Sequence, residues 1–129
     1  MKTIVMLMAV SMLMIVTAPA YSGEAMQIWR CEMGDNASEE EVTAMAQEWL
    51  KAAKTMKGGE RLKVFVNFPV VFNPAGQIDI LFVVVAPSFE EWGKFWDSYA
   101  GSPVAGVDNR NREKIVCPGS ALWEVVRVK

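Results

Sequence analysis

Four stretches of the chain alternate apolar and polar residues, the pattern of β-strands with one buried face. They are residues 26–33, 61–72, 77–86 and 121–128. The second and third are separated by the short sequence NPAG at 73–76, whose asparagine, proline and glycine are typical turn residues. The pattern therefore predicts four strands, of which the middle two form a hairpin.

Two further stretches place apolar residues at helical spacing. Each opens with a capping box, in which a serine and a glutamate three residues later bond the free backbone N–H groups of a helix start. These pairs are Ser38 with Glu41 and Ser88 with Glu91. The first helix should end at the glycines 58–59, and its apolar stripe consists of Val42, Met45, Ala46, Trp49, Leu50 and Ala53.

The second predicted helix is unusually aromatic. Its stripe is formed by Phe89, Trp92, Trp96 and Tyr99, with Phe95 at the flank. Such a stripe could be a platform for a ligand or half of a small hydrophobic core. We favour the core, because large rings bury the most apolar area per residue. The polar segment 102–119 follows, with one or two helical turns around 107–114.

The element order is strand, helix, strand, strand, helix, strand. This order predicts the ferredoxin-like α+β fold, β-α-β-β-α-β, with a four-stranded antiparallel sheet in the order 4-1-3-2 and two helices on one face. Residues 21–129 have the length of one such domain.

Residues 1–20 have the features of a signal peptide. Lys2 precedes an apolar run from Ile4 to Val16 that is too short to span a bilayer, and small residues at 18–20 suit a signal peptidase. We therefore expect a periplasmic or secreted protein that has no membrane segment after cleavage.

Cys31 and Cys117 are the only cysteines. In an oxidising compartment two cysteines usually pair, and the predicted topology brings the end of the first strand beside the start of the last. A disulfide between them is the prediction. A reactive or metal-bound thiol pair is the alternative, although the spacing is not C-x-x-C.

The amino-acid composition argues against several classes of partner and metal site. Without Lys2 the chain has 12 basic and 15 acidic residues, a net charge of −3, which argues against nucleic-acid or anionic-membrane partners. The chain contains no histidine. A metal site would need carboxylates alone, and the sequence DNRNRE at 108–113 places arginines where calcium loops place ligands. We predict no metal and no cofactor.

Strand parity divides the predicted sheet into two faces. The face toward the helices should carry Trp29, Cys31, Val64, Val66, Ile78, Ile80, Phe82, Trp123 and Val125. The other face should carry Ile28, Arg30, Glu32, Phe65, Asn67, Asp79, Leu81, Val83, Glu124 and Val126. The second face is too apolar for water and too charged for a core, which is typical of an interface or a pocket.

With this element order and half-apolar sheet face, the chain resembles the dimeric α/β-barrel superfamily of small ferredoxin-like domains. The resemblance implies sheet-to-sheet homodimers, and members include cofactor-free monooxygenases, haem-degrading enzymes and stress-response proteins. Its haem-binding members use an axial histidine, and its quinone-forming monooxygenases use an Asn, Trp and His set. Asn67 and Trp29 match by type, but this chain has no histidine. The sequences WRCE and VCPGSALWE are also similar to uncharacterised secreted bacterial proteins.

Two functions follow. The first is an exported, non-enzymatic domain that binds a partner or small ligand through the open sheet face. The second is a cofactor-independent monooxygenase-like enzyme, in which paired carboxylates on that face do acid–base work. The candidate ligand or interface residues are Arg30, Glu32, Phe65, Asn67, Asp79, Leu81 and Glu124. An ion-pair cluster that fixes dimer register is the plainer explanation of the charged ones.

Overall fold

The computed structural model describes residues 23–71 and 80–129. These residues form four strands and three helices. They are β1 (Glu24–Met33), α1 (Glu39–Ala53), β2 (Lys63–Asn67), β3 (Ile80–Ala86), α2 (Phe89–Asp97), α3 (Pro103–Arg110) and β4 (Ile115–Val125). The predicted signal peptide, the turn at 73–76, Ile78 and Asp79 lie outside the described residues.

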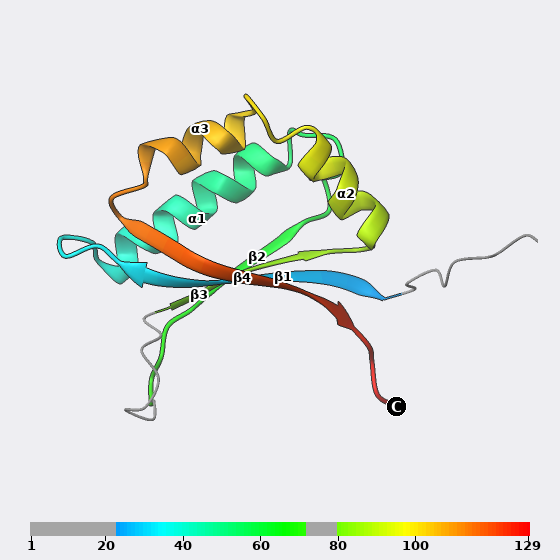
Figure 1. The fold of residues 1–129 in the computed structure, drawn as a ribbon, viewed down its shortest axis with the longest axis horizontal. Coiled ribbons are helices and arrows are strands. Elements are labelled where there is room, and N and C mark those ends of the chain that lie inside the picture. Colours follow the sequence, from blue (N-terminus) through cyan, green and yellow to red (C-terminus); the bar gives the residue numbers. More distant parts are fainter. Residues whose placement is uncertain (1–22, 72–79) are drawn as a thin grey trace, which may run out of the picture.

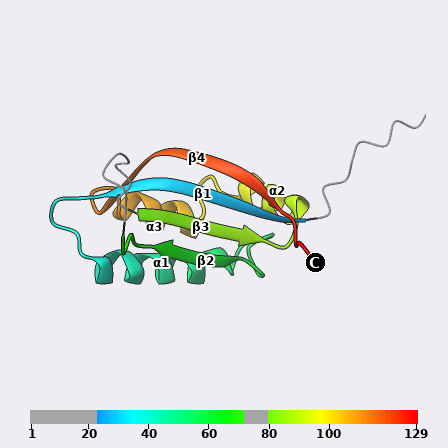
Figure 2. The same ribbon diagram turned by 90° about the horizontal axis from the view of Figure 1, so that it is seen from below.

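The four strands form one antiparallel sheet in the order β2-β3-β1-β4, which confirms the predicted ferredoxin-like arrangement. Figure 1 shows all three helices on one side of the sheet, and Figure 2 shows the four strands side by side. The third helix, α3, has about the length expected in the polar segment, but it lies four residues earlier than 107–114. It starts at Pro103, and the Ser102 hydroxyl caps it by accepting a hydrogen bond from the Ala105 N–H.

Both predicted helix caps form, in different ways. At α1 the Ser38 hydroxyl accepts from the Glu41 N–H while the Glu41 carboxylate accepts from the Ser38 N–H, a complete capping box. At α2 the Ser88 hydroxyl accepts from the Glu91 N–H at 3.2 Å. The Glu91 carboxylate pairs instead with Arg61, because the turn before β2 brings that guanidinium next to it.

The predicted parity holds for β1, β2 and the described part of β3. Trp29 pairs with Phe82, and Phe82 with Val66, so these side chains share the face that the helices cover. Ile28 pairs with Val83, and Val83 with Phe65, on the opposite face. We call this opposite side the open sheet face, because the helices leave it uncovered (Figure 1).

The prediction was wrong for β4, whose parity is reversed. Trp123 pairs with Met26 and Val125 with Glu24, which places both on the open sheet face. Glu124 pairs with Ala25 and therefore lies on the helix side. Val126, expected on the open face, follows the end of the strand.

The cause is a β-bulge. Between the pairs Arg30–Gly119 and Glu32–Val116, β1 advances by two residues and β4 by three, so one extra residue shifts every later side chain to the other face. The same irregular stretch contains Cys117, which the structure places inside β4 rather than before it.

Cys31 and Cys117 form the predicted disulfide, with their Cα atoms 4.0 Å apart. Cys31 is buried, whereas Cys117 is exposed on the edge strand. The bond therefore ties the outermost strand to the middle of the sheet beside the bulge.

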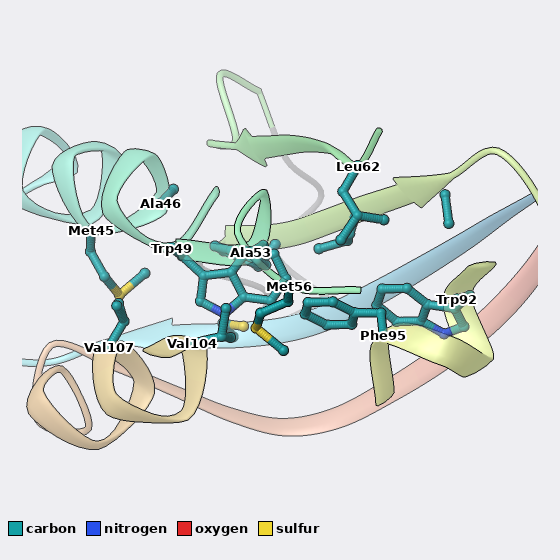
Figure 3. Close-up of a cluster of buried hydrophobic side chains, with 14 of the residues drawn as sticks. Met45, Ala46, Trp49, Ala53, Met56, Leu62, Trp92, Phe95, Val104 and Val107 are labelled. Carbon is teal, nitrogen blue, oxygen red and sulfur yellow. The ribbon is translucent and has the colours of Figure 1, made fainter. Parts of the chain in front are cut away.

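The hydrophobic core lies between the sheet and the helices, and it contains the predicted stripe of α1. In α2 the order of burial differs from the prediction: Phe95 is fully buried, whereas Trp96 is 37% exposed. Figure 3 shows Phe95 and Trp92 side by side in the core, where their rings stack with centroids 5.5 Å apart. Tyr99 follows the end of α2 and packs against the edge of the core.

One glycine allows the turn after α1 to contact α2 closely. Gly58, in the turn after α1, has φ = +82°, and a Cβ there would lie 2.4 Å from the Glu91 carbonyl and 2.7 Å from the Phe95 nitrogen. The turn can therefore press directly on the backbone of α2 only because residue 58 has no side chain. This contact therefore holds the turn after α1 against the backbone of α2 at Glu91 and Phe95.

Candidate functional site

A cavity of about 530 Å³ opens on the helix side of the sheet. That volume falls in the range of small-molecule pockets. Its lining residues come from α1, the segment between α2 and α3, α3 and its following loop, and three strands. They are Trp29, Met45, Trp49, Phe82, Tyr99, Asp108, Asn109, Asn111, Arg112, Ile115, Val116 and Cys117.

The cavity has an apolar floor and a polar mouth. Met45 and Trp49 of α1 and Phe82 of β3 are buried and make the floor. The Trp49 and Phe82 rings meet edge to face with centroids 5.7 Å apart. Asn109 and Arg112 are exposed and mark the mouth, where the Arg112 guanidinium donates to the Asn109 side chain at 2.7 Å.

Asp108 is the one acidic residue that lines this cavity. The Tyr99 hydroxyl donates to its Oδ2 atom at 2.6 Å, and the Trp49 side chain donates a second hydrogen bond. Burial raises the pKa of Asp108, and the two hydrogen bonds offset part of that increase. The carboxylate is thus held by neutral donors in a partly dry site.

Tyr99 has the complementary role. Burial raises the pKa of its phenol to about 12, and the hydrogen bond to Asp108 and the charge of that carboxylate act in the same direction. The phenol therefore keeps its proton at neutral pH and can donate it in the hydrogen bond to Asp108. Of the two groups, Asp108 is the one that can accept a proton or pair with a cation.

Asn111 helps to hold the wall in place. It is buried, and its amide nitrogen donates to the Val107 carbonyl at 2.8 Å, which closes the C-terminal end of α3. Figure 3 shows Val107 of α3 pointing toward Met45 of α1, and both side chains are buried, so they pack α3 against α1.

The sequence-predicted candidates lie elsewhere. Asn67 pairs with Leu81, and Leu81 with Arg30, in one row across the open sheet face, with Phe65 and Glu32 on the same side. Glu124 is on the helix side, and Asp79 lies outside the described residues. Within the described residues no ion pair joins Arg30 to Glu32.

The open sheet face is mostly apolar. Phe65 is 49% exposed and Trp123 is 53% exposed, although both are large hydrophobic residues. Met26, Ile28, Val83 and Val85 lie in the two cross-strand rows that contain these rings, and Leu81 lies in the next row. The polar candidates Arg30, Glu32 and Asn67 gather at one end of this face.

Sequence reasoning missed the residues of the cavity, chiefly Tyr99, Asp108 and Arg112. One pattern could have revealed Asp108: Ser102-Pro103 is a helix start, and Asp108 lies four residues after the apolar Val104 and so shares its side of α3. The cavity itself could not be foreseen, because it depends on the distance between α3 and β4.

Among residues 23–71 and 80–129 no helix is long and apolar enough to cross a membrane. The same residues contain no group of cysteine, aspartate and glutamate side chains that could hold a metal ion.

No protein-family model matches the chain, and no curated protein matches it either. Solved structures do. A protein from Arabidopsis thaliana aligns with a TM-score of 0.55 at 9% identity, covering 83% of this chain and 96% of that one. A dimeric ferredoxin-like protein of unknown function from Thermobifida fusca aligns with a TM-score of 0.53 at 10% identity, covering 81% and 92%.

A third solved structure, from Chloroflexus aurantiacus, carries the name of an antibiotic biosynthesis monooxygenase. It aligns with a TM-score of 0.50 at 15% identity, covering 82% of this chain and 96% of that one. At these identities the likeness shows the fold alone. The chain is a ferredoxin-like α+β protein.

Proposed function

We propose that this protein is an exported binding domain that works as a homodimer. The open sheet face holds the second subunit, and the helix-side cavity takes a small organic ligand. The observation that carries the proposal is the cavity itself, which combines an aromatic floor with one partly buried carboxylate held by Tyr99. Export rests on the signal-peptide pattern of residues 1–20.

This proposal assigns ligand binding and partner binding to two different surfaces, whereas the sequence analysis assigned both to the open sheet face. A small ligand suits the concave helix side, since pockets that bury most of a ligand are concave and mainly apolar. A protein partner suits the open sheet face, which is broad and carries half-exposed Phe65 and Trp123. A second copy of the chain is the simplest partner, and the structural neighbour from Thermobifida fusca is itself dimeric.

Ligand binding can be tested by a thermal-shift screen of small molecules. A compound in the cavity should stabilise the folded state in proportion to its concentration over its Kd. Asn109→Trp places a large ring at the mouth and should abolish the stabilisation. Gln47→Trp, the same ring on an exposed part of α1 that does not line the cavity, should preserve it. Hits that stabilise the Asn109→Trp variant as strongly as the wild type would contradict the proposal.

The dimer can be tested by light scattering at micromolar concentration. Wild-type protein should have about twice the mass of one mature chain. Leu81→Lys puts a second positive charge beside Arg30 on the open sheet face and should give a monomer. Leu122→Lys makes the same change on the helix side of the exposed edge strand and should leave the dimer intact. A wild-type mass of one chain would refute this part of the proposal.

A second candidate is a cofactor-independent monooxygenase-like enzyme. What favours it is Asp108, whose raised pKa and position in a cavity suit a general base, whereas Glu32 is exposed. One neighbour in fold carries a monooxygenase name. Oxygen consumption that depends on an added substrate, and that is lost in Asp108→Asn, would establish this activity over simple binding.

A further inference from the structure

We propose that the ligand of the helix-side cavity is a small aromatic amine, bound with its protonated amino group at Asp108 and its ring against the aromatic floor. This inference rests on the proposed function and names the class of molecule that the cavity selects.

The first step is that Asp108 has no cationic partner within the described chain. The ion pairs there join Arg61 to Glu91, Lys63 to Glu24, Lys94 to Glu90, Arg110 to Glu48 and Lys114 to Glu41. Asp108 is held only by the Tyr99 hydroxyl and the Trp49 side chain, which are neutral. A carboxylate offers about four acceptor positions, so about two remain for a ligand.

The second step is the free-energy cost of partly burying the Asp108 charge without a cationic partner. Two neutral hydrogen bonds orient the carboxylate but leave its charge uncompensated, and burial raises its pKa. A cation that entered the cavity would remove this cost. A neutral ligand would leave it, and an anion would increase it by like-charge repulsion.

The third step concerns the walls. Trp29, Trp49, Phe82 and Tyr99 all line the same cavity as Asp108. The Trp29 and Phe82 rings meet edge to face with centroids 6.0 Å apart, so the floor is a continuous aromatic surface. Such rings attract a cation through their negative faces and stack with a flat ligand ring. An ammonium group on an aromatic ring satisfies both the carboxylate and the floor.

Arg112 is the charge that opposes this assignment. It lines the same cavity, and its charge lowers the pKa of Tyr99 while burial and Asp108 raise it. Arg112 is exposed, however, so water and salt screen it, whereas Asp108 is partly buried. We therefore expect the amine to determine affinity. A carboxylate on the same ligand, placed at the mouth near Arg112, should add a smaller gain.

Four indole compounds separate the contributions of charge, because they share a ring and differ in charge. Tryptamine is cationic, tryptophan is zwitterionic, indole-3-acetate is anionic and 3-methylindole is neutral at pH 7. Isothermal titration of wild-type protein should give tryptamine at least about tenfold tighter binding than 3-methylindole and indole-3-acetate, one charge-assisted hydrogen bond being worth about that factor.

Single-residue variants then test which side chains cause the differences in affinity among these compounds. Asp108→Asn should remove the preference for tryptamine over 3-methylindole. Asp97→Asn, the same change at an exposed position outside the cavity, should keep it. Arg112→Gln should weaken tryptophan relative to tryptamine and leave the preference for the amine intact.

The inference fails if 3-methylindole or indole-3-acetate binds wild-type protein best, or if the preference for tryptamine survives in Asp108→Asn. It also fails if none of the four compounds binds at millimolar concentration. The proposed function has a separate test, since compounds of other classes would still stabilise the wild type and not Asn109→Trp in the thermal-shift screen.

Discussion

Replacing Phe95 with alanine should destabilise the protein far more than replacing its neighbour Trp96. Phe95 is fully buried and lies between the Trp49 and Trp92 rings, at centroid distances of 5.6 and 5.5 Å. Its removal leaves a closed cavity in the core, and such Phe→Ala changes cost about 3–5 kcal/mol. Trp96 is 37% exposed, so its removal leaves a surface depression and costs about 1–2 kcal/mol.

Urea unfolding of the disulfide-intact protein, followed by circular dichroism, measures both free energies. If Phe95→Ala does not fold, the pair Phe95→Leu and Trp96→Leu should show the same order, with a smaller difference, because less volume is removed. A Trp96→Ala variant that loses as much stability as Phe95→Ala, or more, would refute the packing described for α2. It would favour the stripe predicted from sequence, in which Trp96 is central and Phe95 is at the flank.

Three further predictions concern backbone, charge and export. Gly58→Ala should lower the free energy of unfolding by more than about 1 kcal/mol, because residue 58 has positive φ and its Cβ would strike the backbone of α2; an unchanged urea midpoint would contradict this contact. Asp108→Asn should be at least as stable as wild type at pH 7, because burial raises the pKa of Asp108 and the wild-type protein loses stability as the pH rises through that pKa. The stability advantage of the variant should shrink as the pH falls toward 3.8, and an advantage that grows in acid would contradict this prediction. Intact mass spectrometry of exported protein should find a chain that starts near Tyr21 and no reactive thiol at Cys31 or Cys117 after denaturation without reductant; two alkylated cysteines would contradict the bridge.

The local pattern of the sequence determined most of the fold. The capping serines at 38 and 88 and the spacing of apolar residues located α1 and α2, because helix caps and stripes depend on residues a few positions apart. Alternation located β1, β2 and the described part of β3, but it placed the last strand at 121–128, whereas β4 is Ile115–Val125. The element order predicted the sheet order, and the two cysteines independently predicted the disulfide. Each of these features follows from local geometry or from a small set of allowed connections.

Only the tertiary structure decided what depends on contacts between distant segments. The bulge next to Cys117 reversed the parity of β4 and moved Trp123 and Glu124 to the opposite faces, since one extra residue flips every later side chain. Phe95 is buried with the Trp49 ring of α1 packed against it, a contact that no projection of α2 alone can show. Asp108 and Tyr99 meet because α3 packs on α1 and leaves a gap above β4. The candidate site therefore depends on how three helices pack on one sheet, a property that alternation and helical spacing do not encode.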